Sequence, residues 1–471
     1  YLQFLFKALK LPFLPTYNDA QLKYRVKLGK KDQLSIIGLG AYDVSELNPA
    51  ANTGVTDQET LERNVYILNN IPENKQWNYT IGANYQHFKE KSFQTLVVSR
   101  SHLNNKAIKY FDNDDSSQDN LRLDYVSEEI ENKFRFENTY RNNGWKWNYG
   151  VNYEYANYTT NTFNRTVVRD SIVEIRYESG LNMNKLGLFA QASKSMFKER
   201  LVASLGVRTD VNDYSDEMNN PVDQLSPRFS LSYRISPAVS LNFNTGRFFQ
   251  LPPYTVLGYR DGTGELVNKD NNIRYTRSDH LVAGIELNSD KNRKFTLEGF
   301  YKWYSDYPLL LRDSISLANV GGDFGVVGNE PAAPISDGRA FGIEFLAQQR
   351  MWQGLYAIIS YTFVSSEFTD GSGEFRPSSW DFGHILNLVA AKQFGKNWEV
   401  GVKWRYQGGG PYTPFDVATS SIREIWDVNQ SGLPDYSQLN NQRLPASHGM
   451  DIRVDKRYFF DKWSLNVYLD I

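Results

Sequence analysis

The feature that most constrains this chain is a two-residue alternation of apolar and polar side chains that recurs along much of its length. In one stretch the apolar Trp398, Val400, Val402, Trp404 and Tyr406 alternate with Glu399, Gly401, Lys403, Arg405 and Gln407. Residues 295–303, 450–455 and 463–471 repeat the pattern. Successive side chains of a β-strand point to opposite faces, so these stretches predict strands with one apolar and one charged face.

Very short polar turns join the predicted strands in pairs, and long segments separate most pairs. The turns lie at 29–32, 88–91, 142–144, 197–199, 236–238, 290–293, 351–353, 395–397 and 460–462, and the long loops at 44–76, 157–183, 250–276, 307–338 and 408–446. Outer-membrane barrels combine tight periplasmic turns with long extracellular loops. We therefore predict an all-β fold, a large transmembrane antiparallel β-barrel, with an aromatic girdle beside the turns formed by Trp145, Trp147, Trp352, Trp398 and Trp463.

The pattern gives about eighteen strands for residues 1–471. Both ends of such barrels lie in the periplasm, yet residues 21–28 run down into a turn and the last strand runs up from one. An odd number of strands is then missing at each end, which predicts an even total of roughly 20 to 24. The chain also begins at Tyr1 without an initiator Met or a signal segment, so we expect its natural start to lie upstream.

Composition excludes several other classes of protein. The net charge is only -2, which argues against nucleic-acid binding, and the absence of cysteine excludes disulfides and thiolate metal sites. The sequence contains no run of 18 apolar residues, which is the length that a transmembrane helix would need. The sequence contains no nucleophile elbow, P-loop or dinucleotide-binding glycine motif, so we expect no enzyme activity and no cofactor.

Several stretches resemble the barrel of TonB-dependent outer-membrane transporters, especially the form found in Bacteroidota. The run LSPRFSLSYRISPAVSLNFNTGRFFQLPPY (225–254) resembles paired mid-barrel strands that end at an aromatic, proline-rich loop, and similar stretches follow at 278–310, 338–363, 378–416 and 443–471. The resemblance implies 22 strands, with 21–28 as the fourth and 463–471 as the twenty-first. It also implies that a plug domain, a TonB-contacting segment and three strands precede Tyr1.

The resemblance implies TonB-dependent import of a scarce nutrient such as a ferric siderophore, an oligosaccharide or a peptide. Two alternatives stay open, namely a passive porin-like channel and a structural barrel in a secretion or adhesion assembly. The expected surroundings are outer-membrane lipid and lipopolysaccharide. The apolar opening segment YLQFLFKALKLPFLP either folds over the barrel mouth or meets a surface lipoprotein.

Aromatic and charged residues near the strand tops are the candidates for ligand contact. Tyrosine and tryptophan stack on sugar or aromatic rings, and arginine binds anionic groups. For each residue the alternative is ordinary loop packing. The candidates are Tyr254, Arg260, Arg312, Trp380, Tyr412 and Asp416.

Metal binding has one weak candidate, a loop that resembles a calcium loop. Asp427, Asn429, Ser431, Gly432 and Asp435 stand at positions 1, 3, 5, 6 and 9 of a 12-residue calcium loop. Gln438 replaces the bidentate acid at position 12, so we expect an ordinary turn, or calcium affinity no tighter than millimolar. The histidines are scattered and predict structural or solvent-facing roles, namely His87, His102, His280, His384 and His448.

Overall fold

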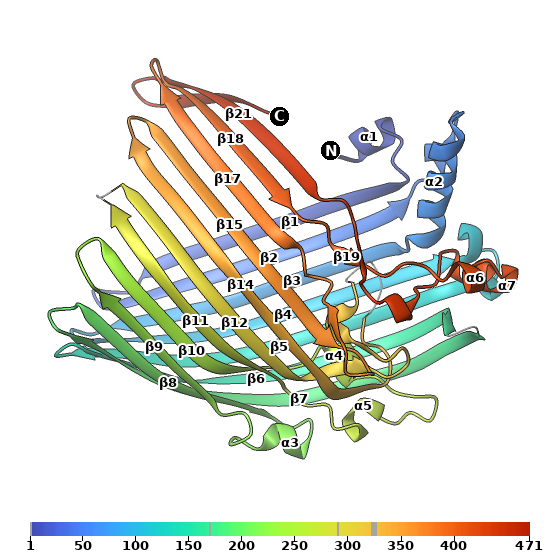
Figure 1. Cartoon of the computed structure of the whole chain (residues 1–471), viewed down its shortest axis with the longest axis horizontal. Helices are drawn as coiled ribbons and strands as arrows, with labels where there is room; N and C mark the ends of the chain where they lie inside the picture. The colour runs from blue at the N-terminus through green and yellow to red at the C-terminus, as the bar shows by residue number, and fades with distance from the viewer. Residues whose placement is uncertain (1, 169–170, 290–291, 322–326) are drawn as a thin grey trace.

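One curved antiparallel sheet forms the wall of the molecule (Figure 1). The computed structural model describes residues 2–168, 171–289, 292–321 and 327–471. Among these residues the sheet has 20 strands, of which β13 (Ile315–Ser316) and β16 (Phe375–Pro377) are very short. The other 18 confirm the expected number, and each pairs with its neighbours along the chain.

The long strands are β1 (Phe13–Lys27), β2 (Asp32–Leu47), β3 (Glu73–Phe88), β4 (Ser92–Tyr110), β5 (Leu121–Asn142), β6 (Trp145–Val168), β7 (Ser171–Met196), β8 (Leu201–Asn212), β9 (Ser226–Arg234), β10 (Val239–Gln250), β11 (Thr276–Ser289), β12 (Arg293–Leu310), β14 (Ala332–Trp352), β15 (Leu355–Thr369), β17 (Gly383–Phe394), β18 (Trp398–Gln407), β21 (Ser447–Phe459) and β22 (Ser464–Asp470). In the described residues β1 pairs only with β2 and β22 only with β21, so the wall has two edges.

Helices are short and lie before the first strand or in the segments that connect strands. They are α1 (Leu2–Ala8), α2 (Gln58–Asn70), α3 (Asp216–Asn219), α4 (Tyr254–Leu257), α5 (Val267–Asp270), α6 (Val417–Ser420) and α7 (Arg423–Asn429). A separate two-stranded ladder joins β19 (Pro411–Tyr412) to β20 (Gln442–Arg443). In the described part of the chain, no helix has the length and apolar character needed to cross a membrane.

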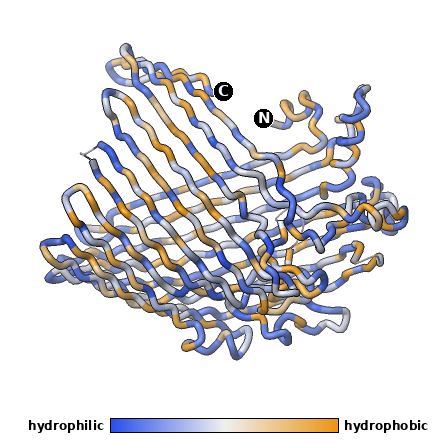
Figure 2. Tube along the Cα trace, in the orientation of Figure 1, coloured by the Kyte–Doolittle hydropathy of each residue, from blue (hydrophilic) through white to orange (hydrophobic). Residues whose placement is uncertain are grey.

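The pairing register sorts the side chains of the wall into two faces, because directly opposed residues share a face. Leu297 on β12 lies opposite Ile285 and Phe345, and all three are exposed and apolar. Its neighbour Glu298 lies opposite Gly284 and Glu344 on the other face. Figure 2 shows the same alternation of hydrophobic and hydrophilic residues along the strands. The apolar face is the lipid-facing one, and the polar face lines the lumen.

The two ends of the wall differ as predicted. All nine short turns connect strands at one end, and at the turn between β5 and β6 Asn143 and Gly144 have φ values of 49° and 76°. Two successive positive φ values suit a tight hairpin, and Asn-Gly adopts them readily. The tryptophans expected in the girdle lie exposed beside these turns, namely Trp145, Trp147, Trp352, Trp398 and Trp463.

Two predicted boundaries were wrong. Residues 157–183 were expected to form a long loop, but β6 and β7 continue through them as a hairpin that pairs Asn157 with Asn182 and Val167 with Ile172. The β7 half of this hairpin keeps a two-residue alternation, and its side chains Tyr177, Leu181 and Met183 are buried. Leu181 and Met183 belong to the core cluster, so packing by the loops, together with backbone pairing, extends the ladder beyond the predicted strands. The first strand also starts at Phe13, well before residue 21, because β2 continues to Leu47 and pairs with it.

Buried apolar residues gather where the long loops pack onto the upper part of the wall. Tyr158 and Met183 of the β6–β7 hairpin contribute to a core cluster with Val256 and Leu257 of α4 and with Leu439. These residues come from three separate segments of the chain. The loops therefore fold onto one another and onto the wall rather than projecting singly into solvent.

Candidate ligand-binding site

An aromatic cavity of about 570 Å³ opens on the lumen face of the wall. Its lining includes Phe248 of β10, His280 of β11, and Lys302 and Tyr304 of β12. Trp380, from the segment between β16 and β17, completes it and is 61% exposed. This volume is in the range of small-molecule sites, and ring faces beside a lysine suit a ligand with both flat and anionic parts.

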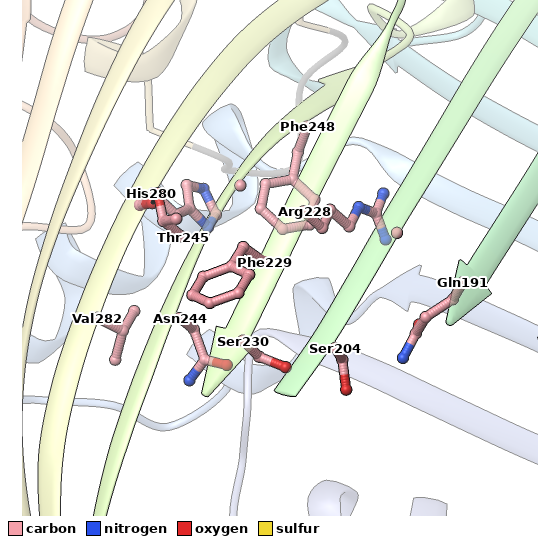
Figure 3. A pocket seen from close by; sticks show the side chains of 12 residues that line it. Gln191, Ser204, Arg228, Phe229, Ser230, Asn244, Thr245, Phe248, His280 and Val282 are labelled. Carbon is pink, nitrogen blue, oxygen red and sulfur yellow. Dashed lines mark hydrogen bonds between the residues drawn. The ribbon is translucent and has the colours of Figure 1, made fainter. Parts of the chain in front are cut away.

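A second cavity of about 280 Å³ adjoins the first and shares Phe248 and His280 with it. Figure 3 shows the ring of Phe248 between Arg228 and His280. The guanidinium carbon of Arg228 lies 4.5 Å from the centroid of the Phe248 ring, and the His280 and Phe248 centroids are also 4.5 Å apart. The imidazole Nε2 lies 2.6 Å from the Ser278 hydroxyl, which fixes the ring plane. The aromatic ring thus carries a cation on one side and an imidazole on the other.

The sheet register explains why these side chains meet. Gly246 on β10 lies directly opposite Arg228 on β9 and His280 on β11, so all three share the lumen face with Phe248. A Cβ atom at Gly246 would lie 3.2 Å from the Cγ atom of Arg228. The glycine therefore leaves the space into which the neighbouring side chains extend.

Tyr254, a predicted ligand contact, is buried within a charged network. Its hydroxyl accepts from Lys185 Nζ at 2.5 Å and donates to Glu131 Oε1 at 3.0 Å. Lys185 also donates to Glu154 at 2.5 Å, and the Tyr254 ring stacks on Tyr158 with centroids 5.7 Å apart. The residue fastens α4 to the lumen face of β5, β6 and β7.

Arg260 and Arg312, two further candidates, lie in different places. Arg260 lines a cavity of about 680 Å³ and donates to the Ser179 hydroxyl at 3.2 Å and to the Gly264 carbonyl at 2.7 Å. Arg312 is mostly buried, and its Nε lies 3.8 Å from Glu330 Oε2. Burial raises the pKa of Glu330 to about 7, although the positive charge of Arg312 opposes the shift.

The last two candidates belong to the segment 408–446. Tyr412 lies on β19 and is 40% exposed. Asp416 caps α6, and the hydroxyl of Thr419, with the backbone N–H groups of Thr419 and Ala418, holds the pKa of its carboxyl below the usual value. Of the six candidates, only Trp380 lines the aromatic cavity on the lumen wall.

Long-range hydrogen bonds tie the outer segments into a connected layer. The side-chain amide of Asn440 donates to the carbonyls of Asn319 at 2.9 Å and Pro377 at 2.8 Å. Gln430, directly after α7, contacts the end of α2, where the Asn70 amide donates to the Gln430 carbonyl at 2.8 Å. The segment 408–446, which follows β18, is therefore bound both to α2 and to the segments around Asn319 and Pro377. In Figure 1 its helices α6 and α7 lie beyond the ends of the strands, on the same side as α2.

The residues of the weak calcium candidate make local structure. Asp427 lies within α7 and pairs with Arg423 at 3.6 Å, while Asn429 donates to the Ser431 carbonyl at 2.9 Å. The Asp435 carboxylate accepts from the backbone of Ser437 and from the Gln438 amide. Within the described ranges no three His, Cys, Asp or Glu side chains gather as a metal site would require.

The lumen cluster was not anticipated from the sequence. Phe248, Arg228 and Lys302 were not singled out, and His280 was expected to be structural or solvent-facing. One signal was available, because Phe248 interrupts the polar series Ser240, Asn242, Asn244 on the lumen face of β10. A bulky ring in an otherwise polar series was therefore the one visible sign of this cluster.

Comparison with known proteins gives a family. The sequence matches the family description "TonB dependent receptor-like, beta-barrel" over residues 16–470. No curated protein sequence matches the chain.

Solved structures show the same fold at low sequence identity. A copper transporter, OprC, superimposes with a TM-score of 0.65 and 12% identity, over 95% of this chain and 66% of that one. The ferripyoverdine receptor of the outer membrane of Pseudomonas aeruginosa has a TM-score of 0.65 and 12% identity, over 97% of this chain and 61% of that one. The ferric-catecholate import receptor Fiu from E. coli K12 has a TM-score of 0.60 and 11% identity, over 97% of this chain and 70% of that one.

The chain thus spans about two thirds or less of the length of the first two structures. Their fold agrees with the family match, and the family is one of outer-membrane transporters rather than enzymes. With the apolar outer face and the asymmetric connections, the match fixes the location of the wall in the outer membrane. The chain belongs to the TonB-dependent receptor β-barrel family.

Proposed function

We propose that this chain supplies the wall and the capture surface of a TonB-dependent importer for a scarce nutrient too large for porins. The observation that carries the proposal is the aromatic cavity on the lumen wall, where Trp380, Tyr304 and Lys302 combine ring faces with a positive charge. Flat rings with anionic substituents fit such a lining, as do sugar rings. A ferric siderophore, an oligosaccharide and a peptide all contain suitable groups.

The structural neighbours favour a metal-bearing ligand among these classes. Their names refer to copper, to ferripyoverdine and to ferric catecholate. All share only 11–12% identity with this chain, so they support the transport class and leave the ligand to experiment.

We further propose that the complete protein adds strands and a plug domain to this wall. The two unpaired edges at β1 and β22 support additional strands, and the greater length of the related structures leaves room for both. In this mechanism the loops and plug capture the ligand, and TonB uses the proton-motive force to displace the plug. A passive channel and a platform barrel would need no such coupling.

A partner at the cell surface is a further part of the proposal. Phe4 and Leu9, in and just after α1, are 80% and 60% exposed. Exposed apolar side chains at the outer end of a barrel suit a protein partner, such as a surface lipoprotein.

The test is accumulation of labelled ferric siderophores, oligosaccharides and peptides in cells that express the complete protein. We expect one class to accumulate, accumulation to stop with an uncoupler or without TonB, and surface binding to persist. Initial uptake that ignores both treatments would favour the passive channel. Binding without uptake under any condition would favour the platform barrel.

A further inference from the structure

The periplasmic end of the wall carries an excess of positive charge, although the whole chain has a net charge of -2. Among the described residues, the short turns between the strand ends contain eight basic and three acidic residues. The basic residues are Lys30, Lys31, Lys89, Lys91, Lys198, Arg200, Lys396 and Lys462, and the acidic ones are Glu90, Glu199 and Asp461. This end of the barrel therefore attracts anions more strongly than the rest.

Three lysines near the turn ends of their strands face outward from the wall, and we call them the basic rim: Lys194, Lys392 and Lys456. The register fixes their direction, because Lys194 lies opposite Trp145, Lys392 opposite Val400, and Lys456 opposite Trp398. These partners belong to the apolar outer face. The ammonium groups consequently lie at the boundary between hydrocarbon and the lipid headgroups.

Each ammonium is held by the neighbouring hairpin turn. Lys194 Nζ donates to the Asn143 carbonyl at 2.9 Å, Lys392 Nζ to the Gln353 carbonyl at 2.5 Å, and Lys456 Nζ to the Lys396 carbonyl.

Two of the ammonium groups also lie over a girdle tryptophan. The Nζ atom of Lys194 lies 5.0 Å from the ring centroid of Trp145, and that of Lys456 lies 5.0 Å from the ring centroid of Trp398. A held side chain loses less conformational entropy when it binds an anion.

The rim lysines keep donors free for a ligand. An ammonium has three N–H donors, and each carbonyl accepts one. In the part of the chain that the structure describes, no acidic side chain pairs with Lys194, Lys392 or Lys456. Ammonium N–H groups that are free at the level of the lipid headgroups can bind a phosphate.

We propose that the basic rim binds the phosphate of anionic phospholipids in the periplasmic leaflet. A zwitterionic phosphatidylcholine headgroup carries its own cation, which competes with lysine, whereas phosphatidylglycerol has a net negative charge. The rim therefore selects phosphatidylglycerol. This inference depends on the outer-membrane location and not on the transported ligand.

The test measures lipid selectivity with the full-length protein in phosphatidylcholine vesicles that contain spin-labelled phosphatidylglycerol or spin-labelled phosphatidylcholine. The motionally restricted fraction of each probe gives their relative association constant. For the wild type we expect about threefold preference for phosphatidylglycerol, which falls towards one in 1 M NaCl because salt screens exposed charges.

The rim variant carries Lys194→Gln, Lys392→Gln and Lys456→Gln, and its preference should fall to about one. A matched control carries Lys27→Gln, Lys146→Gln and Lys294→Gln, which lie at the same end but on the lumen face, opposite Gln33, Ser193 and Gln348. The control should keep the threefold preference.

Three results would overturn the proposal: no wild-type preference, an unchanged preference in the rim variant, or an equal loss in the control. Even if a variant fails to fold, the salt titration of the wild type decides whether the protein has an electrostatic preference for phosphatidylglycerol.

Discussion

The ring of Phe248 lies 4.5 Å from the ring of His280, measured between centroids, on the lumen face of two adjacent strands. The two side chains line both the 570 Å³ and the 280 Å³ cavities, so they form the wall that the cavities share. A ligand in either cavity would therefore contact the same aromatic surface. The pair is therefore the first place to test whether the wall contributes to binding.

Replacing Phe248 by alanine should weaken binding of the imported ligand by about three- to tenfold, because an aromatic contact contributes roughly 0.5–1.5 kcal/mol beyond its buried area. The dissociation constant should be measured on whole cells after uptake assays have identified the ligand. Phe243→Ala is the control, since Phe243 lies on the same strand but shares the outer face with Leu231 and Ala283. Equal effects of the two changes would argue against a role for the lumen wall.

Glu330 should make the outer segment around Arg312 sensitive to pH. Burial raises the pKa of Glu330 to about 7 from a usual value of 4.5, so the folded segment binds a proton that the unfolded one has released. Between about pH 4.5 and 7 the folding free energy of this segment therefore becomes less favourable as pH rises. Amide hydrogen exchange of residues 312–320, corrected for intrinsic rates, should be faster at pH 7.5 than at pH 5.

The matched variant is Glu330→Gln, which keeps the shape of the side chain and removes its titration. Its corrected exchange rates should differ little between the two pH values. Parallel pH profiles for the wild type and the variant would exclude Glu330 as the cause.

The sequence predicted the wall much better than the site. A strand has a period of two, so Leu297 and Glu298 are assigned to opposite faces without knowledge of any neighbour. The hairpin turns then fix which strands pair, and for this reason the predicted number of strands agrees with the number of long strands in the structure. In the hairpin 157–183 the signal is uneven: residues 173–183 on β7 alternate between apolar and polar, whereas the Thr- and Asn-rich residues 157–166 on β6 carry few apolar side chains, and the whole stretch was assigned to a loop.

The site depends on relationships that the period of a strand does not contain. Arg228, Phe248 and His280 meet because three strands pair in one register, and a shift of one residue on β10 would turn Phe248 outward. Tyr254 had the residue type expected of a ligand contact, but its hydroxyl is occupied by Lys185 and Glu131 from strands far away in the sequence. The local sequence does not contain the long-range packing that places Tyr254 in this network.

The assignment of faces can be tested directly on β18. Val402 lies opposite Ala390 and Ile452 on the apolar face, so Val402→Arg should destabilise the barrel by about 2–4 kcal/mol if the residue is near the membrane midplane. Lys403 lies on the lumen face, 3.4 Å from Asp451, and both side chains are well exposed. Since exposed ion pairs contribute little, Lys403→Gln should change stability by less than about 1 kcal/mol. Urea unfolding in lipid vesicles measures both changes in stability, and equal tolerance of the two substitutions would show that the assigned faces are wrong.

Asn440 should control how firmly the segment 408–446 is attached to its neighbours. Its amide donates to two backbone carbonyls, the residue is 6% exposed, and its φ of 53° suits asparagine or aspartate. Asn440→Asp keeps the shape but places a carboxylate against the carbonyls of Asn319 and Pro377, at a cost of about 1–3 kcal/mol. Because proteases cleave the open state, limited proteolysis within 408–446 should accelerate about tenfold or more. Asn441→Asp makes the same change in charge at an exposed neighbour and should leave the rate unchanged. If the two variants were cleaved at the same rate, the hydrogen bonds of Asn440 would not be what holds the outer layer together.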